Sequence, residues 1–427
     1  MKSTALATRP ARHRIARLCL PLAALAAFAA CCGTARGDGT ATPAAPQASA
    51  DARAPELSKG DRPVTPFING EKWPDADGEH INAHGGGVIF HEGSYYWYGE
   101  ARPAVKGAPA GVACYSSKDL QHWKNEGLAL AKVDDEASDI VKGCIIERPK
   151  VIHNAKTGKF VMWFHLELKG RGYGAARTAL AVSDTPTGPF TYKRSLRPNA
   201  GIWPLDLPDE LRTPLDKEGT KALQDKMGHR PAMTAAGMYT RRDFEGGQMA
   251  RDMTLFVDPD DAKAYLIASA EENFTLNVHE LTDDYTDFTG KWTRIVPGGH
   301  NEAPAVVKHD GRYYMLASGC TGWAPNDARV LEATSMWGPW KNTGNPCRGT
   351  NPLMKMGPKL TFGGQSTAIL PIQGKPDTYV ALYDLWRPKD LRNSGYFWLP
   401  ITFEKGRMVV QWRDQWDPAS VGLTTKP

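Results

Sequence analysis

The sequence predicts an all-β fold, a five-bladed β-propeller, and two observations lead to this prediction. From about residue 63 onward, short β-branched and aromatic runs alternate with Gly, Asp, Asn and Pro turns, and little helical periodicity is present. Five segments of this region also share one layout: a polar residue, an apolar strand, a turn and a second, aromatic strand. A four-stranded unit repeated around an axis is typical of a propeller, whereas a two-sheet sandwich would not require so regular a unit.

Each repeat begins with a predicted β-hairpin. In the first, His84 precedes the strand 88–90, which a short turn connects to the aromatic strand 95–98. Two more strand-like pieces follow each hairpin, so that every unit contains four strands. The other predicted hairpins pair 151–152 with 160–164, 254–256 with 264–267, 305–307 with 313–316 and 367–370 with 379–383. Examples of the predicted fourth strand are 120–123, 188–190 and 338–340.

One stretch interrupts this rhythm between the second and third repeats. Residues from about 197 to 247 form an insertion, and 208–227 within it are rich in Leu, Lys, Glu and Gln, which favour helix. We expect the insertion to cover one face of the propeller, where its Met, Trp and Arg side chains are available to shape a pocket wall.

The N-terminal residues predict export. Residues 1–31 combine an Arg-rich start with an apolar run too short to span a bilayer permanently, which is typical of a signal peptide. Phe28-Ala29-Ala30-Cys31 resembles a bacterial lipobox with Cys31 as the lipidated residue, and cleavage nearby by an ordinary signal peptidase is the alternative. Residues 32–62 resemble a flexible Ala/Pro-rich tether. We therefore expect a lipid anchor in the bacterial envelope, in the periplasm or at the cell surface, and a catalytic domain over 63–427.

The charge distribution excludes one class of partner. The chain has 427 residues and a formal net charge of +5, and basic residues of the first 30 account for all of it. The remainder is neutral, so a nucleic-acid-binding face is not indicated. No cofactor is implied, and we expect a monomer whose only membrane contact is the lipid anchor.

Cysteine spacing does not indicate a metal site. Four cysteines remain beyond the anchor region, and no CxxC pair is present among them. Disulfides and buried free thiols both stay open for Cys114, Cys144, Cys320 and Cys347.

The polar residues at the start of the innermost strands are the candidate active-site residues. These are His84, Glu147, Asp252, Glu302 and Gln365, and a five-fold ring would bring them together at one mouth of the central channel. Carboxylates held close together cannot all stay ionised, so at least one pKa should rise. A protonated acid beside a second polar group is the arrangement that glycoside hydrolysis requires. Among the aromatic residues, Tyr173, Trp323 and Trp386 lie in loops or beside polar clusters and are candidates for stacking on a sugar ring.

Several motifs then resemble a known family. AHGGGVIF, CYSSKDLQHW, ERPKVIHN, ARDMTLF, EAPAVVK, GCTGWAPND and GYFWLPITF are similar, in order and spacing, to the exo-β-1,3-galactanase branch of glycoside hydrolase family 43 over roughly residues 80–405. The resemblance implies an inverting enzyme with Glu302 as the general acid. It also implies that Asp252 orients and tunes this acid and that Glu147 contacts the terminal galactose.

The catalytic base stays open at this stage. Most of the family has an aspartate where this chain has His84, and the galactanase branch is similar in lacking it. Gln365 matches the glutamine proposed to replace that base, and Glu147 and His84 are the alternatives. The resemblance further implies substrate contacts from Glu100, Tyr173, Asn273, Thr321, Asp384 and Trp386.

Three functions follow from these observations. The first is an exo-acting galactosidase that releases galactose from β-1,3-galactan chains, as in arabinogalactan. The second is an α-L-arabinofuranosidase or β-xylosidase, against which the missing aspartate argues. The third is a catalytically inactive propeller that binds surface glycans, against which the retained trio of Glu302, Asp252 and Glu147 argues.

Overall fold

The computed structural model describes residues 66–421, except 104, 106–107 and 229. The chain divides into two units, 1–62 and 63–427, and the description below concerns the second. The predicted signal peptide, tether and lipidation site at Cys31 lie outside the described residues.

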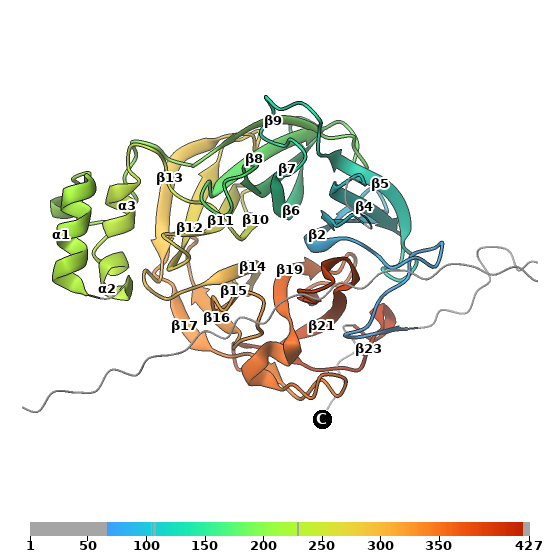
Figure 1. Ribbon diagram of the computed structural model, residues 1–427. Helices are drawn as coiled ribbons and strands as arrows, with labels where there is room; N and C mark the ends of the chain where they lie inside the picture. The colour runs from blue at the N-terminus through green and yellow to red at the C-terminus, as the bar shows by residue number, and fades with distance from the viewer. Residues whose placement is uncertain (1–65, 104, 106–107, 229, 422–427) are drawn as a thin grey trace, which may run out of the picture. The chain divides into compact units, whose positions relative to one another are not determined.

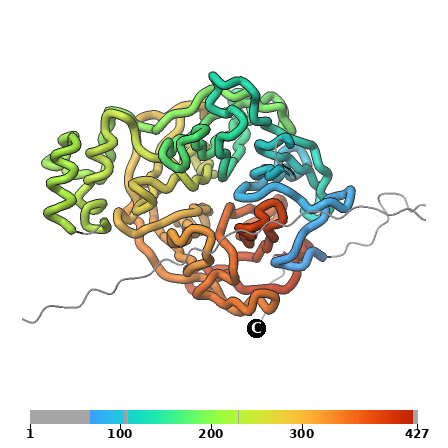
Figure 2. Tube along the Cα trace, viewed as in Figure 1, coloured from blue at the N-terminus to red at the C-terminus, as the bar shows by residue number. Residues whose placement is uncertain are grey.

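Five antiparallel sheets surround a central axis, as Figures 1 and 2 show, so the predicted five-bladed propeller is confirmed. In each blade four strands follow one another in sequence order, and the first lies innermost. The innermost strands contact one another around the ring. Their bounds are β2 (His84–His91), β6 (Ile145–Asn154), β10 (Met253–Val257), β14 (Glu302–His309) and β19 (Gln365–Pro371).

The remaining strands complete the blades. Blade one adds β3 (Ser94–Ala101), β4 (Gly111–Ser117) and β5 (Lys124–Ala131), and blade two adds β7 (Lys159–Glu167), β8 (Arg177–Ser183) and β9 (Thr191–Leu196). Blade three adds β11 (Ala264–Ala270), β12 (Thr275–Leu281) and β13 (Phe288–Ile295), and blade four adds β15 (Arg312–Ser318), β16 (Arg329–Ala333) and β17 (Lys341–Gly344). Blade five adds β20 (Tyr379–Leu385), β21 (Gly395–Glu404) and β22 (Arg407–Gln411), with β18 (Cys347–Arg348) parallel at its edge.

The predicted positions of the outermost strands were three or four residues early. Residues 120–122 form a bend, residues 123, 188–190 and 338–340 have no regular structure, and β5, β9 and β17 begin directly after these segments. In the first case the Ser117 hydroxyl accepts a hydrogen bond from the Leu120 amide, and the Asp119 carboxylate accepts two more from the following amides. Such side-chain acceptors favour a turn over a sheet ladder.

Packing between the blades forms the core. A cluster of buried tryptophans, Trp73, Trp97, Trp123 and Trp398, lies between blades one and five. The ring is closed here by the pairing of β1 (Phe67–Ile68), near the start of the domain, with β23 (Gln415–Trp416), near its end. Asn69 is fully buried and joins both ends of the domain, because its amide donates to the carbonyls of Trp398 and Arg413 and accepts from the Trp398 amide.

The insertion is helical and lies at the outer side of blade three, at the left of Figure 1. It contains η1 (Asp209–Leu211), α1 (Lys217–Met227), α2 (Arg230–Ala235) and α3 (Met238–Arg242). Helix α1 confirms the helical propensity of 208–227. It begins at Asp216, which accepts the Gly219 amide, and ends at Gly228 in the left-handed conformation. Three short 3₁₀ elements lie elsewhere: η2 (Pro358–Gly363), η3 (Leu391–Asn393) and η4 (Pro418–Ser420).

Two further features concern the described residues only. Within them, no helix combines the length and apolar character needed to cross a bilayer. The four described cysteines, Cys114, Cys144, Cys320 and Cys347, are free thiols, and all but Cys320 are buried.

Candidate active site

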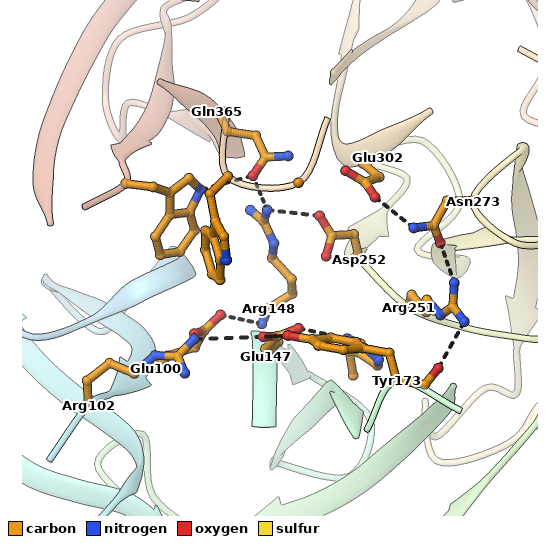
Figure 3. A pocket seen from close by; sticks show the side chains of 14 residues that line it. Glu100, Arg102, Glu147, Arg148, Tyr173, Arg251, Asp252, Asn273, Glu302 and Gln365 are labelled. Atoms are coloured by element: carbon orange, nitrogen blue, oxygen red, sulfur yellow. Dashed lines mark hydrogen bonds and ion pairs between the residues drawn. The ribbon is translucent and has the colours of Figure 1, made fainter. Parts of the chain in front are cut away.

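The starts of four innermost strands meet at one pocket of about 210 Å³ (Figure 3). Glu147 lies on β6, Asp252 directly precedes β10, Glu302 opens β14 and Gln365 opens β19. The repeat pattern therefore brings these four predicted residues together. The full lining is Glu100, Arg102, Glu147, Arg148, His165, Tyr173, Arg251, Asp252, Asn273, Glu302, Gly322, Trp323, Gln365 and Trp386.

Glu302 has the properties of a group that stays protonated near neutral pH. Its Oε1 accepts a hydrogen bond of 2.7 Å from Nδ2 of Asn273. Burial, and then the negative charge of Asp252, raise the pKa of Glu302 to about 7. A carboxyl group with such a pKa can donate a proton and regain it within the physiological range.

Arg148 organises the centre of the pocket. It follows Glu147 at an irregularity of the β6–β7 pairing and has a positive φ of 53°. Its Nη2 lies 2.8 Å from Oδ2 of Asp252 and donates to Oε1 of Gln365 at 2.5 Å. The same Gln365 oxygen accepts the indole N–H of Trp386 at 3.0 Å. Guanidinium and indole groups only donate, so the Gln365 carbonyl must face them, and its amide nitrogen faces Ser318 at 2.9 Å.

Glu147 is held as an anion. The Tyr173 hydroxyl donates to its Oε1 at 2.7 Å, and Nδ1 of His165 lies 3.3 Å from its Oε2. Burial alone would raise the pKa of Glu147, but the hydrogen bond and charge of His165 outweigh it and lower this pKa to about 2. Burial likewise opposes the charge on His165, yet its carboxylate partners Glu147 and Glu167 raise the pKa of His165 to about 9.

One group of pocket residues has the spacing of a metal site. Ligand atoms of Glu147, His165 and Asp252 lie within 4.8 Å of one another. A metal ion would require the imidazole to be neutral, and with a pKa of about 9 His165 would have to release a proton first. In this structure His165 lies between the carboxylates of Glu147 and Glu167, and Asp252 is paired with Arg148, so all three groups already have partners.

Three residues predicted to contact substrate lie outside the pocket lining. His84 is fully buried, donates from Nε2 to the Arg392 carbonyl at 3.1 Å and stacks on Tyr396 with ring centres 5.1 Å apart. Burial lowers its pKa to about 3. Asp384 is buried and accepts the Gly85 amide. The Thr321 hydroxyl donates to the Ala324 carbonyl within its own loop.

The place expected for His84 is taken by Glu100 of the adjacent strand. His84 and Glu100 are register partners on β2 and β3. Gly85 has a φ of 61°, and a Cβ at this position would lie 2.5 Å from Oε1 of Glu100. The glycine therefore leaves room for Glu100 to reach the pocket, where its Oε1 accepts the Arg148 amide at 3.1 Å.

The predicted aromatic residues do line the pocket. Trp323 and Trp386 pack edge to face with ring centres 5.3 Å apart. Tyr173 and Trp323 stay 49% and 42% exposed, respectively, which leaves ring surface free at the pocket mouth. The insertion, whose Met, Trp and Arg side chains were available to shape a pocket wall, does not do so here, because none of its described residues (197–228 and 230–247) belongs to the lining of this pocket.

The sequence reasoning missed five lining residues: Arg102, Arg148, His165, Arg251 and Gly322. Two signals were present, since Arg148 directly follows Glu147 in ERPK and Arg251 directly precedes Asp252 in ARDM. A cluster of carboxylates near one axis requires compensating cations, which is the general reason to look for adjacent arginines.

Comparison with solved structures decides the family. The GH43 β-1,3-galactosidase BT3683, solved with galactodeoxynojirimycin, is 53% identical, with a TM-score of 0.76 over 82% of this chain and 100% of that chain. The chain belongs to glycoside hydrolase family 43. The sequence pattern of "Glycosyl hydrolases family 43" also matches residues 224–366. The predicted resemblance to this family and to its galactanase branch is confirmed.

More distant members of the family share the fold. The exo-β-1,3-galactanase 1,3Gal43A from Clostridium thermocellum is 34% identical, with a TM-score of 0.64 over 82% of this chain and 65% of that one. A variant of an exo-β-1,3-galactanase from Phanerochaete chrysosporium, solved with β-1,3-galactotriose, is 28% identical, with a TM-score of 0.63 over 83% and 69%. A comparison with curated proteins finds no match.

Proposed function

We propose that this family 43 glycoside hydrolase is an exo-acting β-1,3-galactosidase that releases galactose from β-1,3-galactan chains with inversion. The observation that carries this proposal is that one small pocket holds both Glu302, with its pKa of about 7, and the ion pair of Asp252 with Arg148. The three related enzymes above are named as β-1,3-galactosidases or exo-β-1,3-galactanases, which supports the substrate class.

The pocket shape supports attack at a chain end. Its volume of about 210 Å³ lies below the roughly 300–1,000 Å³ of sites for drug-sized ligands, so it suits a single sugar ring. Arg148, which lines the pocket, is buried, and so is Lys150 two residues further along β6, whose ammonium donates to the Gly85 carbonyl at 2.8 Å. A pocket that holds one sugar ring admits the terminal residue of a chain and excludes the rest.

Glu302 is the general acid of the proposed mechanism. Its proton passes to the glycosidic oxygen as the bond to the anomeric carbon breaks, so that galactose leaves the rest of the chain. Asp252 tunes this step, because its negative charge disfavours ionisation of Glu302 before the proton is needed. Glu147, fixed as an anion, accepts hydrogen bonds from hydroxyl groups of the terminal sugar.

Gln365 positions the attacking water in this mechanism. Its carbonyl oxygen is occupied by Arg148 and Trp386, and one N–H of its amide is donated to Ser318, which leaves the second N–H as the group that contacts water. Two donors at Oε1 also oppose an imidic O–H form, which would need an acceptor there. Glu147 is a weaker choice, because a carboxylate with a pKa of about 2 holds an abstracted proton poorly. Water that attacks an oxocarbenium-like carbon becomes acidic as the new bond forms and releases its proton to the surrounding solvent, from which Glu302 is reprotonated, so orientation is the main requirement for the attacking water.

The test of this function is a comparison of substrates. Wild-type protein is incubated with β-1,3-galactobiose, an aryl α-L-arabinofuranoside and an aryl β-xyloside, and products are identified by chromatography. Release of galactose from the first, with at most trace cleavage of the others, supports the proposal. Preference for either pentoside, or hydrolysis of none while galactobiose binds, would replace it with one of the two alternative functions.

The envelope location is a separate proposal. We propose export and lipidation at Cys31, supported by the Arg-rich start, the short apolar run and the small residues before the cysteine. The domain then acts as a monomer at the end of its tether. An acylated N-terminus at Cys31 in the intact mass of membrane-fraction protein is the expected result, and a lipid-free mature form that begins elsewhere would contradict it.

A further inference from the structure

The turn between β11 and β12 has an unusual backbone conformation. Glu271, Glu272 and Asn273 have φ values of 52°, 58° and 65°. Three successive non-glycine residues in the left-handed region are rare, and such a conformation persists only where the surrounding contacts hold it. The contacts that hold this turn are therefore informative.

Helix α3 of the insertion supplies most of these contacts. Thr240 donates a hydrogen bond to the buried carboxylate of Glu271, which Arg294 also contacts at 3.4 Å. Both Nη atoms of Arg242 donate to Oε1 of Glu272 at 3.2 Å. The guanidinium of Arg242 is itself held by Asp243, with two hydrogen bonds of 2.7 Å.

The third residue of the turn reaches the proposed general acid. Nδ2 of Asn273 donates to Oε1 of Glu302 at 2.7 Å, and its Oδ1 accepts from Nη1 of Arg251 at 3.2 Å (Figure 3). Because Arg251 only donates, the Asn273 amide must present its nitrogen to Glu302. Arg251 also lies 3.6 Å from Oε2 of Glu272. Glu272 thus connects Arg242 of the insertion with the residues that hold Glu302.

We propose that Arg242 is a positioning residue for Glu302, acting through Glu272 and Asn273, and that this is the contribution of the insertion to catalysis. Arg242 does not line the pocket. Its role is to keep the left-handed turn in place, so that the Asn273 amide fixes one oxygen of Glu302 and the carboxyl group stays aligned with the glycosidic oxygen. This inference rests on the proposed function of Glu302 as the general acid.

The experiment compares Arg242→Ala with Arg241→Ala, its neighbour on α3. Arg241 is a matched control because it donates to the Thr213 carbonyl, away from the turn. Each variant is assayed on β-1,3-galactobiose, whose leaving group needs protonation, and on 2,4-dinitrophenyl β-galactoside, whose leaving group does not. Loss of alignment should lower kcat on the disaccharide about tenfold with KM nearly unchanged, and should lower the rate on the activated substrate less than about threefold. The control should stay within about twofold on both substrates.

A coupling test separates positioning from general destabilisation. In an Asn273→Ala background, Arg242→Ala should cause no further loss beyond about twofold, because the connection is already broken. Equal losses on both substrates, a full additional loss in the Asn273→Ala background, or wild-type behaviour of Arg242→Ala would each overturn the proposal. If Arg242→Ala does not fold, Glu272→Gln, which keeps the shape of the side chain, is tested by the same criteria.

One readout does not depend on the reaction. Hydrogen exchange of the peptide that contains residues 271–273 should be faster in Arg242→Ala than in Arg241→Ala. Equal exchange in the two variants would overturn the inference about Arg242, whatever the activity of the wild-type protein. Failure of the wild-type protein to hydrolyse either substrate would instead refute the proposed function. The two failures are therefore distinguishable.

Discussion

Nη2 of Arg148 lies 2.8 Å from Oδ2 of Asp252, and through the same nitrogen it donates to the carbonyl of Gln365. One buried guanidinium therefore fixes both the carboxylate that tunes Glu302 and the amide that we assign to the attacking water. The positive charge also keeps Asp252 paired beside Glu302, where two free carboxylates would repel each other. The residues of the proposed mechanism thus form one connected unit.

Glu302→Gln should lower turnover of β-1,3-galactobiose about 10²–10⁴-fold, the usual contribution of a general acid, and leave sugar binding largely intact. The fold should also persist. Because burial and Asp252 raise the pKa of Glu302 above its ordinary 4.5, its ionisation costs stability as the pH rises through about 7, and the amide avoids that cost. Rate assays and thermal unfolding at pH 8 measure both effects. A variant that keeps more than about a tenth of wild-type turnover would remove Glu302 from this role.

Asp252→Asn should move the alkaline limb of the pH–rate profile to lower pH. In the wild type, kcat/KM should fall above about pH 7, as Glu302 loses the proton that it donates. Removal of the Asp252 charge lowers the pKa of Glu302, so the fall should begin earlier. Asp258→Asn is the control, since Asp258 binds Lys308 just beyond the other end of β10. An unchanged alkaline limb in Asp252→Asn would show that the two carboxyl groups are not coupled.

Substitutions at Gln365 and Glu147 separate the two candidates for handling water. Gln365→Ala should nearly abolish turnover, whereas Gln365→Glu should retain activity with an altered pH profile, because a carboxylate can both position water and accept its proton. Near-normal activity in Gln365→Ala would exclude the assignment.

The corresponding test of Glu147 uses Glu147→Gln with added azide. If Glu147 accepted the proton of water, this variant would be as inactive as Glu302→Gln, and azide would restore turnover by replacing water. We expect no rescue and weaker galactose binding, because Glu147 holds the sugar. Calorimetric binding of galactose measured on the same sample distinguishes the two causes.

Asn69→Ala should weaken the closure of the ring. Asn69 is fully buried and links β1 to the backbone of residues 398 and 413. Unpaired buried groups cost about 1–3 kcal/mol, so the free energy of unfolding should fall by at least about 2 kcal/mol. Asn125→Ala, at an exposed position of β5, is the control and should change the free energy of unfolding by less than about 0.5 kcal/mol. Denaturant unfolding measures the free energy of unfolding of both variants, and equal values would contradict a role of Asn69 in closing the ring.

The sequence was sufficient to predict the repeat and the residues at its most regular position. Glu147, Asp252, Glu302 and Gln365 stand at equivalent places in successive blades, and a closed ring must bring equivalent places together. His84 failed the same argument for a local reason. Gly85 has a positive φ and admits Glu100 from β3, so the side chain of His84 turns to Tyr396 instead. The replacement of His84 on β2 by Glu100 on the neighbouring strand β3 does not change the spacing of the repeats, so the sequence pattern gives no sign of it.

Other features depend on contacts between distant residues. The insertion was recognised as helical over 208–227, but its link to Glu302 runs through Arg242, Glu272 and Asn273, which only the folded chain brings together. The ion pair that compensates the charge of Asp252 could not be predicted either, because Arg148 and Asp252 are about one hundred positions apart in the sequence. The alternation of residues along a strand indicates on which face of the sheet a side chain lies, but it does not indicate which distant side chain that residue contacts.

The central claim is inverting release of galactose from a chain end, and proton NMR of the first products of β-1,3-galactotriose tests it most directly. We predict that free galactose and β-1,3-galactobiose appear together, and that the galactose signal is α-anomeric before mutarotation sets in. Inversion requires this outcome, because water attacks the face opposite to the departing chain. Initial β-galactose, or the appearance of a product without free galactose, would contradict the account.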